Sequence, residues 1–379
     1  MPNDYAVYLK SPTGTLLTVL DRFSLLDLTW GVNQVGRLRV DLPYGAYSGF
    51  VFQPEGILEV WRSINGAPPY LVGNKQYLMR IQDKTVPTSG VKTLTLTGID
   101  QNVVLARKII AHVTGSAQAL LSGACDDLCK SVVKNEMGSG ATDYFGAATA
   151  RDISAYLTVD ANLGLGPSTQ HAISQRNVLL ALQDICNIAP LAPSNAQYLA
   201  FDITSTVPAS GIAWILQTFI GQRGQDHRFP GGSAPIILSP DSGAISEIQE
   251  TYDYENVFNF YYVGGQGVGA GRTYASASDA ASIGLGPFGR VENFIPSVNS
   301  NNTTVLQLEG SQGLRQNRAR RTFIARYSDT PGQIYGQHFK EGDYLTIWFD
   351  DTLDARVDGL NIRVEAGEEK ITLAFRTDS

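Results

Sequence analysis

A glycine-rich segment is the first candidate for chemistry in this 379-residue chain. Residues 261–274, YYVGGQGVGAGRTY, follow an apolar stretch, and Gly265, Gly267 and Ala270 fit the spacing G-x-G-x-x-A. That pattern binds a dinucleotide only when the loop leaves a buried strand and opens a helix whose N-terminus holds the pyrophosphate. The residues that follow show no apolar stripe at helical spacing and are interrupted by glycine and proline. The segment therefore favours a hairpin loop over a nucleotide site.

Two cysteines have a spacing that can ligate a metal. Cys125 and Cys129 lie four residues apart on an expected helix and so share a face, but no second pair of cysteine or histidine residues completes a tetrahedral site. Packing as small core residues is the favoured interpretation. With Cys186, the chain has three cysteines, which is typical of assembly in a reducing cytoplasm without a disulfide framework. We expect neither a metal nor a cofactor.

Acidic and histidine side chains suggest hydrolytic chemistry only weakly. Asp226 and His227 have the residue types of half a catalytic group, but no nucleophile accompanies them in the sequence, and a charged, exposed loop is the favoured interpretation. Asp350 and Asp351 are adjacent, and adjacent residues of a strand point to opposite faces, whereas glycoside hydrolysis requires two acids across a cleft. No hydrolase or phosphate-binding motif is present either. The sequence thus predicts no catalytic residues and no enzyme activity.

One charge pattern is more pronounced. Residues 315–326, RQNRARRTFIAR, contain five arginines and no acid, and residues 247–255, EIQETYDYE, contain four acids and no base. They are either two solvated faces or matched patches at a subunit contact, where arginine is suited to bidentate pairing. Partners within one chain are a further alternative. The candidate interface residues are Arg315, Arg318, Arg320, Arg321, Glu247, Glu250, Asp253 and Glu255.

Length and composition indicate a β-rich protein of two or three domains. The chain is 43% hydrophobic and 17% charged, has 38 glycines, and carries a net charge of −7. An acidic chain is no nucleic-acid clamp, because such domains are usually basic. No signal peptide is visible, and the most apolar stretch, GIAWILQTFI, is about half the length of a membrane span. We expect no stable insertion into a membrane.

Periodicity divides the chain into three regions. Residues 1–108 alternate as strands, for example RLRVDLP, and are expected to form an N-terminal β-barrel. Residues 109–205 form a mixed α/β insert with a helix from Ser116 to Gly138, a loosely structured segment at 139–173, and a second helix from about Ser174. Residues 206–379 form a second β-barrel domain with long loops. The predicted fold is mainly β with an α/β insert.

The ordered features resemble a known family. The segments LTWGVNQVGRLRVDLP, LTGIDQNVVLARKII and PIILSPDSGAISEIQETYDYENVFNFYYVGGQGVGAGR resemble, in this order, the hub proteins at the tail tip of siphoviruses, which are related to the baseplate hub of contractile tails. In the second segment Gly98, Leu105, Arg107, Ile109 and Ile110 match the family pattern. The family's Arg-Asp-Leu is Ile99-Asp100-Gln101 here, so only the aspartate is kept.

The resemblance implies a function. Two tail-tube-like β-barrel domains per chain would assemble into a homotrimeric ring that adapts a sixfold tail tube to a threefold spike or fibre and lines the DNA channel. In the family the glycine-rich run is a loop of the second barrel domain. A negative channel wall would avoid the counterion-release binding that a basic wall invites.

The implied partners are other copies of the chain, a distal tail protein or tail tube protein, a central spike or fibre protein, the tape measure protein, and DNA only in passage. The implied location is the tail tip of the virion, after assembly in the host bacterial cytoplasm. Two alternatives are a tail-associated cell-wall or capsule hydrolase and a receptor-binding tail protein.

Overall fold

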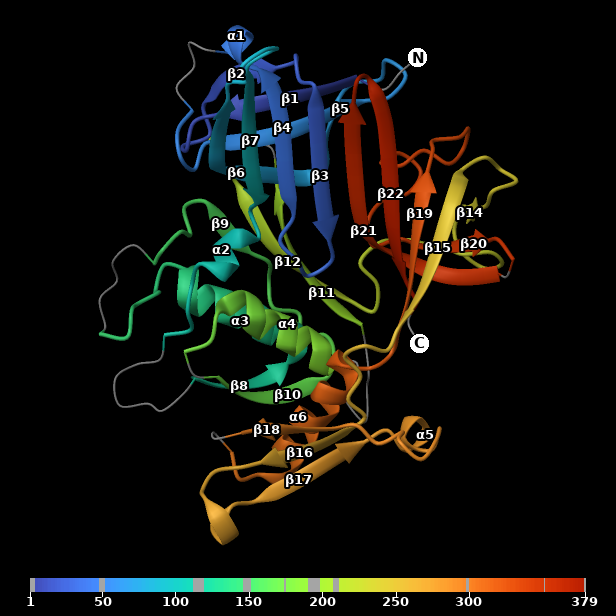
Figure 1. Ribbon diagram of the computed structural model, residues 1–379. Coiled ribbons are helices and arrows are strands. Elements are labelled where there is room, and N and C mark those ends of the chain that lie inside the picture. Colours follow the sequence, from blue (N-terminus) through green and yellow to red (C-terminus); the bar gives the residue numbers. More distant parts are fainter. Residues whose placement is uncertain are drawn as a thin grey trace.

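The computed structural model describes residues 4–47, 52–111, 119–145, 151–173, 175–189, 198–206, 211–297, 300–350 and 352–377 (Figure 1). The strands in the first half of the chain are β1 (Asp4–Lys10), β2 (Leu16–Leu20), β3 (Leu25–Gly31), β4 (Arg37–Pro43), β5 (Ile57–Ser63), β6 (Tyr70–Thr85), β7 (Thr93–Asp100), β8 (Ala119–Ala124), β9 (Leu157–Val159) and β10 (Ser168–Ile173). The strands in the second half are β11 (Leu199–Ser205), β12 (Trp214–Ile220), β13 (Asp226–His227), β14 (Ile237–Leu238), β15 (Ile245–Asp253), β16 (Phe260–Gly264), β17 (Tyr274–Ser278), β18 (Glu292–Pro296), β19 (Arg320–Tyr327), β20 (Tyr344–Trp348), β21 (Thr352–Glu365) and β22 (Glu368–Arg376).

Helices are few, which confirms the prediction of a mainly β fold. They are α1 (Tyr44–Tyr47), α2 (Val103–Ala106), α3 (Cys125–Met137), α4 (Val178–Ile188), the 3-10 turn η2 (Gly269–Gly271), α5 (Ala280–Ile283) and α6 (Thr303–Gln316). Among the described residues, no helix is both long and apolar enough to cross a membrane.

One large sheet joins the two ends of the chain. Within the described residues it contains fourteen strands, and its main path is β15-β19-β22-β21-β3-β4-β7-β6-β5-β1-β2, with β20 beside β21 and both β13 and β14 beside β20. The antiparallel pair β21–β3 connects the C-terminal strands to the N-terminal strands, with Ile362 opposite Leu28. The two β regions that the sequence predicts separately are therefore continuous through hydrogen-bonded strands (Figure 1).

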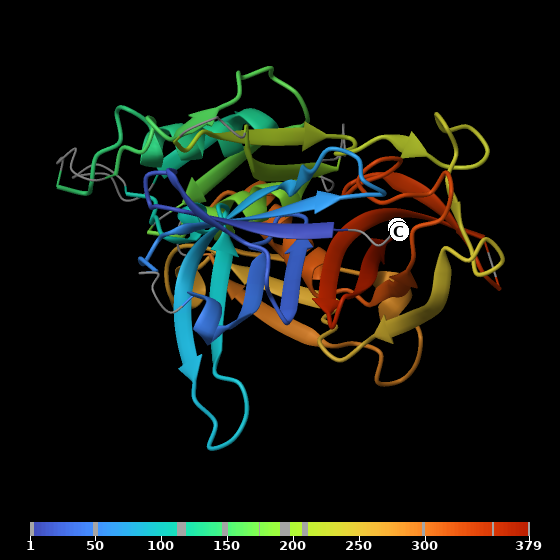
Figure 2. The ribbon, with the colours of Figure 1, turned by 90° about the horizontal axis from the view of Figure 1, so that it is seen from above.

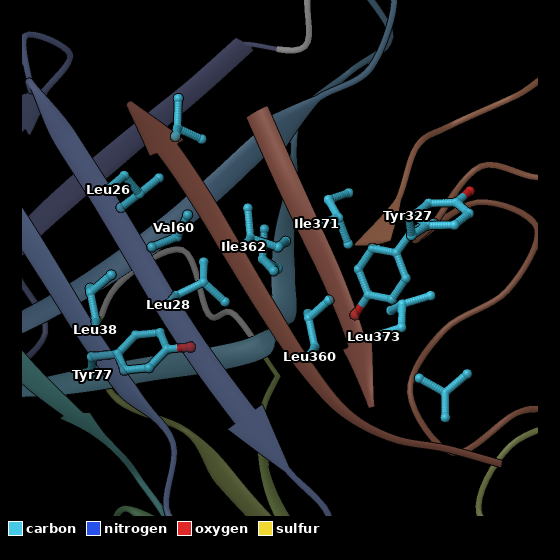
Figure 3. Close-up of a cluster of buried hydrophobic side chains, with 14 of the residues drawn as sticks. Leu26, Leu28, Leu38, Val60, Tyr77, Tyr327, Leu360, Ile362, Ile371 and Leu373 are labelled. Atoms are coloured by element: carbon cyan, nitrogen blue, oxygen red, sulfur yellow. The ribbon is translucent and has the colours of Figure 1, made fainter. Parts of the chain in front are cut away.

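A single hydrophobic core fills the inner side of this sheet. Leu26 and Leu28 of β3, Ile362 of β21 and Val60 of β5 are all buried in one cluster, and Figure 3 shows β5 crossing behind β3 and β21. The alternation predicted for RLRVDLP is confirmed, because Leu38, Val40 and Leu42 are buried whereas Arg37 and Arg39 are exposed. Burial of this apolar face is the main force that holds the curled sheet together.

Gly98, a residue of the family resemblance, occupies a crowded place in β7. A Cβ atom at Gly98 would lie 2.8 Å from the Cβ atom of Tyr77 on the neighbouring strand β6. Tyr77 is fully buried, so it has little room to move aside. A side chain at this position would therefore separate β6 from β7 at the centre of the sheet.

The middle region packs two helices against small sheets. The strand β8 pairs with β10, and β11 pairs with β12, which in turn pairs with β9. The boundary predicted at residue 205 falls between β11 and β12. Because these two strands pair along their whole length, β12 belongs with the middle region. The segment 139–173, expected to be loosely structured, contains β9 and β10.

The first predicted helix starts later than expected. Residues 119–124, which fit a helical stripe, form β8 because they pair with β10, and the helix α3 begins at Cys125. Tertiary pairing here outweighs the helical spacing of the apolar residues. Gly138 ends the helix as predicted, while Ser116 lies outside the described residues.

The second predicted helix is confirmed with a different cap. The helix α4 begins at Val178, and the side chain of Asn177 accepts a hydrogen bond from the backbone N–H of Leu180. Val178, Leu182 and Ile185 are buried on one face, as the spacing predicts. Ser174 lies outside the described residues.

The glycine-rich segment lies in a separate small unit, at the lower end of the molecule in Figure 1. There β16 pairs with β17 and β18, and α6 packs on one face of this sheet at Gly310 and Gly313, where a Cβ atom would meet Val263 and Tyr261 within about 3 Å. The segment is the hairpin connection between β16 and β17, as its residues favour. The expectation that it belongs to the second barrel is wrong, because among the described residues no strand of this sheet pairs with a strand of the large one.

Candidate functional site

The outer side of the large sheet is a polar surface, because the register of the strands places polar side chains of neighbouring strands next to one another. Directly opposite residues of antiparallel strands share a face. Asp27 on β3 lies opposite both Arg39 on β4 and Arg363 on β21, and Arg363 lies opposite Lys370 on β22. We call this surface, which runs from β6 to β15, the polar sheet face. Its charged side chains outside the core are Arg37, Arg39, Arg326, Arg363, Lys370, Arg376, Asp27, Asp41, Asp83, Glu247, Asp253, Glu365 and Glu368.

The charges of the polar sheet face are close to balanced. Six of these residues are basic and seven are acidic. Nitrogen–oxygen distances are 2.9 Å for Arg39–Asp41 and for Arg363–Glu365. Such exposed pairs each contribute about 0 to 1 kcal/mol to stability. Their collective effect is to leave no large patch of one sign, so the chain's net negative charge is not concentrated on this face.

The polar sheet face ends in two open strand edges. Among the described residues, β15 pairs with β19 on one side and with no strand on the other. At the other end, β5 pairs with Tyr70–Leu78 of β6, and the rest of β6, from Arg80 to Thr85, pairs only with β7. Both open segments are mostly exposed, and the β6–β7 hairpin protrudes from the body of the molecule (Figure 2). Unpaired edges of this length are sites at which another strand can add.

The arginine run and the acidic run meet within one chain. The strands β15 and β19 pair with Asp253 opposite Arg320, so the two runs are neighbours in the sheet. Arg321 forms an ion pair with Glu250, and Arg326 forms one with Glu247 at 3.2 Å. The side chain of Arg320 lies outside the described set. The intrachain alternative therefore accounts for these two pairs without a second subunit.

The other candidate interface residues lie near the end of these strands. Glu255 follows β15, and its backbone N–H donates to the side chain of Asp253. Arg315 lies in the last turn of α6, and Arg318 lies between α6 and β19. Both arginines line a cleft that the sequence did not predict.

This cleft has a volume of about 970 Å³ and lies where the large sheet, the middle region and the small unit meet. Its walls come from the β3–β4 turn, α4, the end of α6 and the ends of β15, β19 and β22. Its charged lining consists of Arg176, Arg315, Arg318, Arg321, Arg376, Asp184 and Asp358. We call it the arginine cleft.

Asp184 anchors one wall of the arginine cleft. Its carboxylate lies 2.6 Å from the guanidinium of Arg176 and accepts a hydrogen bond of 3.0 Å from the side chain of Gln312 on α6. Burial raises the pKa of Asp184, while the neighbouring Arg176 opposes that shift. These contacts tie α4 to α6 and so fix the small unit against the middle region.

A buried ionic network joins the large sheet to the middle region. Lys75 of β6 contacts Asp202 of β11 and lies 3.7 Å from Asp100 of β7. The other carboxylate oxygen of Asp202 contacts Arg223, and the side-chain amide of Asn102 donates to Asp202 at 3.0 Å. Burial raises the pKa of Asp100 to about 6. The sequence signalled only Asp100, through the family resemblance, and gave no sign of its partners.

The remaining chemical candidates do not form a reactive site. Asp226 is bound by Arg228 at 2.7 Å, and His227 is buried with its Nδ1 2.7 Å from the carbonyl oxygen of Ser233. In the glycine-rich hairpin, Arg272 donates to the carbonyl oxygens of Gly264 and Gly265 at 2.8 Å each. The loop thus directs carbonyl acceptors at a guanidinium, an arrangement that does not suit a phosphate.

The cysteines pack in the core of the middle region. Cys125, Cys129 and Cys186 are buried, and burial raises the pKa of Cys125 to about 11, which disfavours the nucleophilic thiolate. Among the described residues, no group of three histidine, cysteine or acidic side chains is placed to hold a metal. Of the adjacent acids, Asp351 lies outside the described residues.

Comparison with known proteins gives the class of the molecule. A tail protein from Neisseria meningitidis MC58 is 13% identical with a TM-score of 0.57, and the match covers 99% of this chain and 97% of that one. The 43 kDa tail protein of prophage MuSo2 from Shewanella oneidensis is 10% identical with a TM-score of 0.58, and the match covers 98% and 97%. The fold is thus that of phage tail proteins. No curated protein sequence matches the chain.

The family follows from the sequence itself. Residues 6–375 match the Siphovirus ReqiPepy6 Gp37-like protein family, and the chain belongs to that family. The resemblance to siphovirus tail proteins is therefore confirmed over almost the whole length, and the protein is a structural component of a phage tail.

Proposed function

We propose that this tail protein is a hub at the tail tip, where three copies form a ring that adapts a sixfold tail tube to a threefold spike or fibre. The observation that carries this proposal is the composition of the polar sheet face. Four of its strands, β6, β7, β4 and β3, come from the N-terminal half, and four, β21, β22, β19 and β15, come from the C-terminal half. Each chain thus contributes two similar strand sets, and three chains contribute six.

Ring closure uses the two open edges. The outer edge of β15 and the open part of β6, from Arg80 to Thr85, lie at opposite ends of the polar sheet face, although the sheet itself continues from β6 through β5 and β1 to β2. A contact between two different surfaces of the same molecule produces a closed ring when the rotation between copies is suitable. Pairing β15 of one copy with β6 of the next satisfies the backbone groups of both edges, which otherwise invite uncontrolled aggregation.

We propose that the polar sheet face lines the DNA channel of this ring. Affinity for DNA arises largely from lysine and arginine side chains that replace the counterions of phosphates. On this face, Arg39, Arg326 and Arg363 already contact carboxylates of the same chain. A wall of paired charges releases few counterions, so DNA passes without being held. This mechanism replaces the negative wall that the sequence suggested.

The ring places the protein among defined neighbours. One rim contacts the distal tail protein or tail tube protein, and the other contacts the central spike or fibre, with the tape measure protein above the channel. The ring assembles in the host cytoplasm and acts in the virion at the tail tip. Its role is mechanical, without catalysis, and no described side-chain cluster favours the hydrolase or receptor-binding alternatives.

The test is the symmetry of the purified assembly. Mass photometry should show a species of three chains, and cryo-electron microscopy should show a threefold ring with β15 beside β6 of the neighbouring copy. Six identical copies in one sixfold ring, or β15 exposed in the assembled tail tip, would contradict the proposal. Turnover of peptidoglycan that is lost on replacing Asp226 would contradict the mechanical role.

A further inference from the structure

The small unit is inserted between two neighbouring strands of the large sheet. The chain leaves the sheet at the end of β15 and returns at the start of β19, where Asp253 lies opposite Arg320. Between these points, residues 258–317 form β16, β17, β18, α5 and α6. Figure 1 shows this unit below the ends of the two strands. The small unit is thus joined to the large sheet through two adjacent points of the chain.

The base of the small unit is closed by hydrogen bonds of its own. The backbone N–H of Phe258 donates to the carbonyl oxygen of Asn317 at 3.0 Å, and the side-chain amide of Asn317 donates to the hydroxyl of Tyr261 at 2.7 Å. Between this base and the large sheet lie only residues 254–257 and 318–319, which are mostly exposed. We call these two segments the tethers. Exposed segments of a few residues between two packed bodies are where hinge motions change the backbone dihedral angles.

The small unit also has a core of its own. Tyr261, Val263 and Leu306 are buried, and none of these three residues belongs to the hydrophobic core of the large sheet or to that of the middle region. A Cβ atom at Gly310 would lie 3.1 Å from the side chain of Val263, and one at Gly313 would lie 2.8 Å from the ring of Tyr261, so α6 packs closely on its sheet. A unit with its own core can move as a rigid body.

The boundary between the small unit and the middle region is polar where the arginine cleft runs along it. On the small unit, Arg315 and Gln316 line the cleft. On α4, three of the five lining residues are polar, namely Gln183, Asp184 and Asn187. Units of one chain move relative to one another unless their interface is large and hydrophobic. The polar boundary therefore favours motion of the small unit over rigid attachment.

One carboxylate bridges this boundary. Asp184 of α4 accepts a hydrogen bond from the side chain of Gln312 at 3.0 Å and another from the side chain of Gln316. The two glutamines lie four residues apart on α6 and so share a face of that helix. The side chain of Asp184 is only 15% exposed, so water competes little for these contacts. Asp184 thus acts as a latch between α4 and α6.

We propose that the small unit is a hinged lid on the arginine cleft, which turns on the two tethers and is held closed by Asp184. Opening breaks the contacts of Asp184 with α6, widens the cleft and uncovers the wall that α4 forms. The large sheet and the middle region keep their relative position, because the buried network around Lys75 joins them. The motion takes place within one chain, so it stands or falls separately from the proposed hub function.

Double electron–electron resonance on the full chain tests this proposal. Spin labels are attached at Ser276→Cys on β17 and Asn135→Cys on α3, two exposed positions on either side of the boundary. The reference pair is Thr29→Cys on β3 with Asn135→Cys, which reports on the large sheet and the middle region. The three native cysteines are buried, and the unsubstituted chain measures any labelling at them.

The latch variant is Asp184→Ala. The matched control is Asp127→Ala, which removes a carboxylate of α3 that accepts hydrogen bonds from the backbone of residues 163–164, outside the contact of α4 with α6. Circular dichroism shows whether each variant is folded. If Asp184→Ala does not fold, Gln312→Ala with Gln316→Ala removes the two donors of the latch instead.

We expect the latch variant to shift the distances between positions 276 and 135 toward a second, longer distance, and to raise its population about threefold or more. The control variant should leave the distribution of the original chain unchanged, and the reference pair should keep one distance throughout. Equal shifts in the latch and control variants would overturn the proposal. It would also be overturned by a single unchanged distance in the latch variant, or by an equal broadening of the reference pair.

Discussion

Arg62 of β5 and Glu369 of β22, which lie 307 residues apart in the sequence, form a buried ion pair with an N–O distance of 2.9 Å. The Arg62 side chain is fully buried and also contacts Asp329 at 2.7 Å and the carbonyl oxygen of Tyr335 at 2.9 Å. This cluster joins β5 to residues of the C-terminal half of the chain, in addition to the pairing of β3 with β21. The two halves of the large sheet are therefore fixed to one another twice.

Replacing Arg62 should destabilise the whole sheet. Arg62→Ala leaves the acidic partners without their buried counter-charge, and breaking such a pair costs about 3 to 5 kcal/mol in the free energy of unfolding. Urea unfolding followed by tryptophan fluorescence measures this loss. The control is Arg363→Ala. The side chain of Arg363 is 43% exposed, so this substitution should lower the free energy of unfolding by about 1 kcal/mol or less. Equal effects of the two substitutions would show that the buried cluster does not hold the halves together.

The Asp100 carboxyl should impose a pH dependence on stability. Burial raises its pKa from 3.8 to about 6, so between those values the folded chain binds more protons than the unfolded chain. Stability from this group is therefore greatest below pH 4 and falls as the pH rises to 6, by on the order of 3 kcal/mol. Asp100→Asn removes this slope, although it costs about 1 to 3 kcal/mol at every pH because one backbone N–H loses its acceptor.

The effect of Asp100 has to be measured as the difference between the original chain and Asp100→Asn, because buried His171 also makes stability depend on pH. Burial lowers the pKa of His171 to about 4, so its contribution to stability rises with pH in the same window and opposes that of Asp100. Because both proteins contain His171, the difference between their unfolding free energies isolates Asp100. A difference that stays constant between pH 4 and 6 would contradict the prediction.

The ion pair between Arg321 and Glu250 should affect the stability of one chain and not the assembly of several chains. Arg321→Glu is expected to lower stability by about 1 kcal/mol or less, because the pair is partly exposed. Adding Glu250→Arg should restore the lost stability, since the two side chains then pair in the opposite sense. Ring assembly, measured by sizing, should survive in both variants. Loss of assembly that the swap fails to restore would place Arg321 at a subunit contact.

The protruding β6–β7 hairpin should be required for assembly. Replacing Val86–Lys92 by a two-residue Asn-Gly turn removes the protruding tip of the hairpin but no core side chain, because residues 86–92 are exposed and Thr85 already lies opposite Thr93. We expect a folded monomer that forms no ring in mass photometry. The matched control shortens the β16–β17 hairpin at Gln266–Gly271, which should leave assembly intact. A normal ring from the first variant would show that the tip of this hairpin is not needed for assembly.

The sequence alone determined the class of fold and the family. The alternation of Leu38, Val40 and Leu42 with polar residues lies within a single strand. The strand could therefore be predicted without knowing which distant segment pairs with it. The start of α3 was not readable, because residues 119–124 also fit a helical stripe and only their pairing with β10 makes them a strand. Short apolar stretches can fit both the helical and the strand periodicity, and pairing with another strand decides which structure forms.

Only the tertiary structure decided which residues act together. The sequence identified the arginine run and the acidic run but left open whether their partners lie in the same chain. Opposite charges show that two segments can pair, but they do not show which copies of the two segments meet. The register of β15 and β19 answered that question for Arg321 and Glu250. The arginine cleft and the Lys75 network were invisible beforehand, since their members lie in separate elements and become neighbours only when the large sheet packs against the middle region. Spacing along a chain specifies what one helix or strand presents, whereas a site built from several elements exists only after the core has formed.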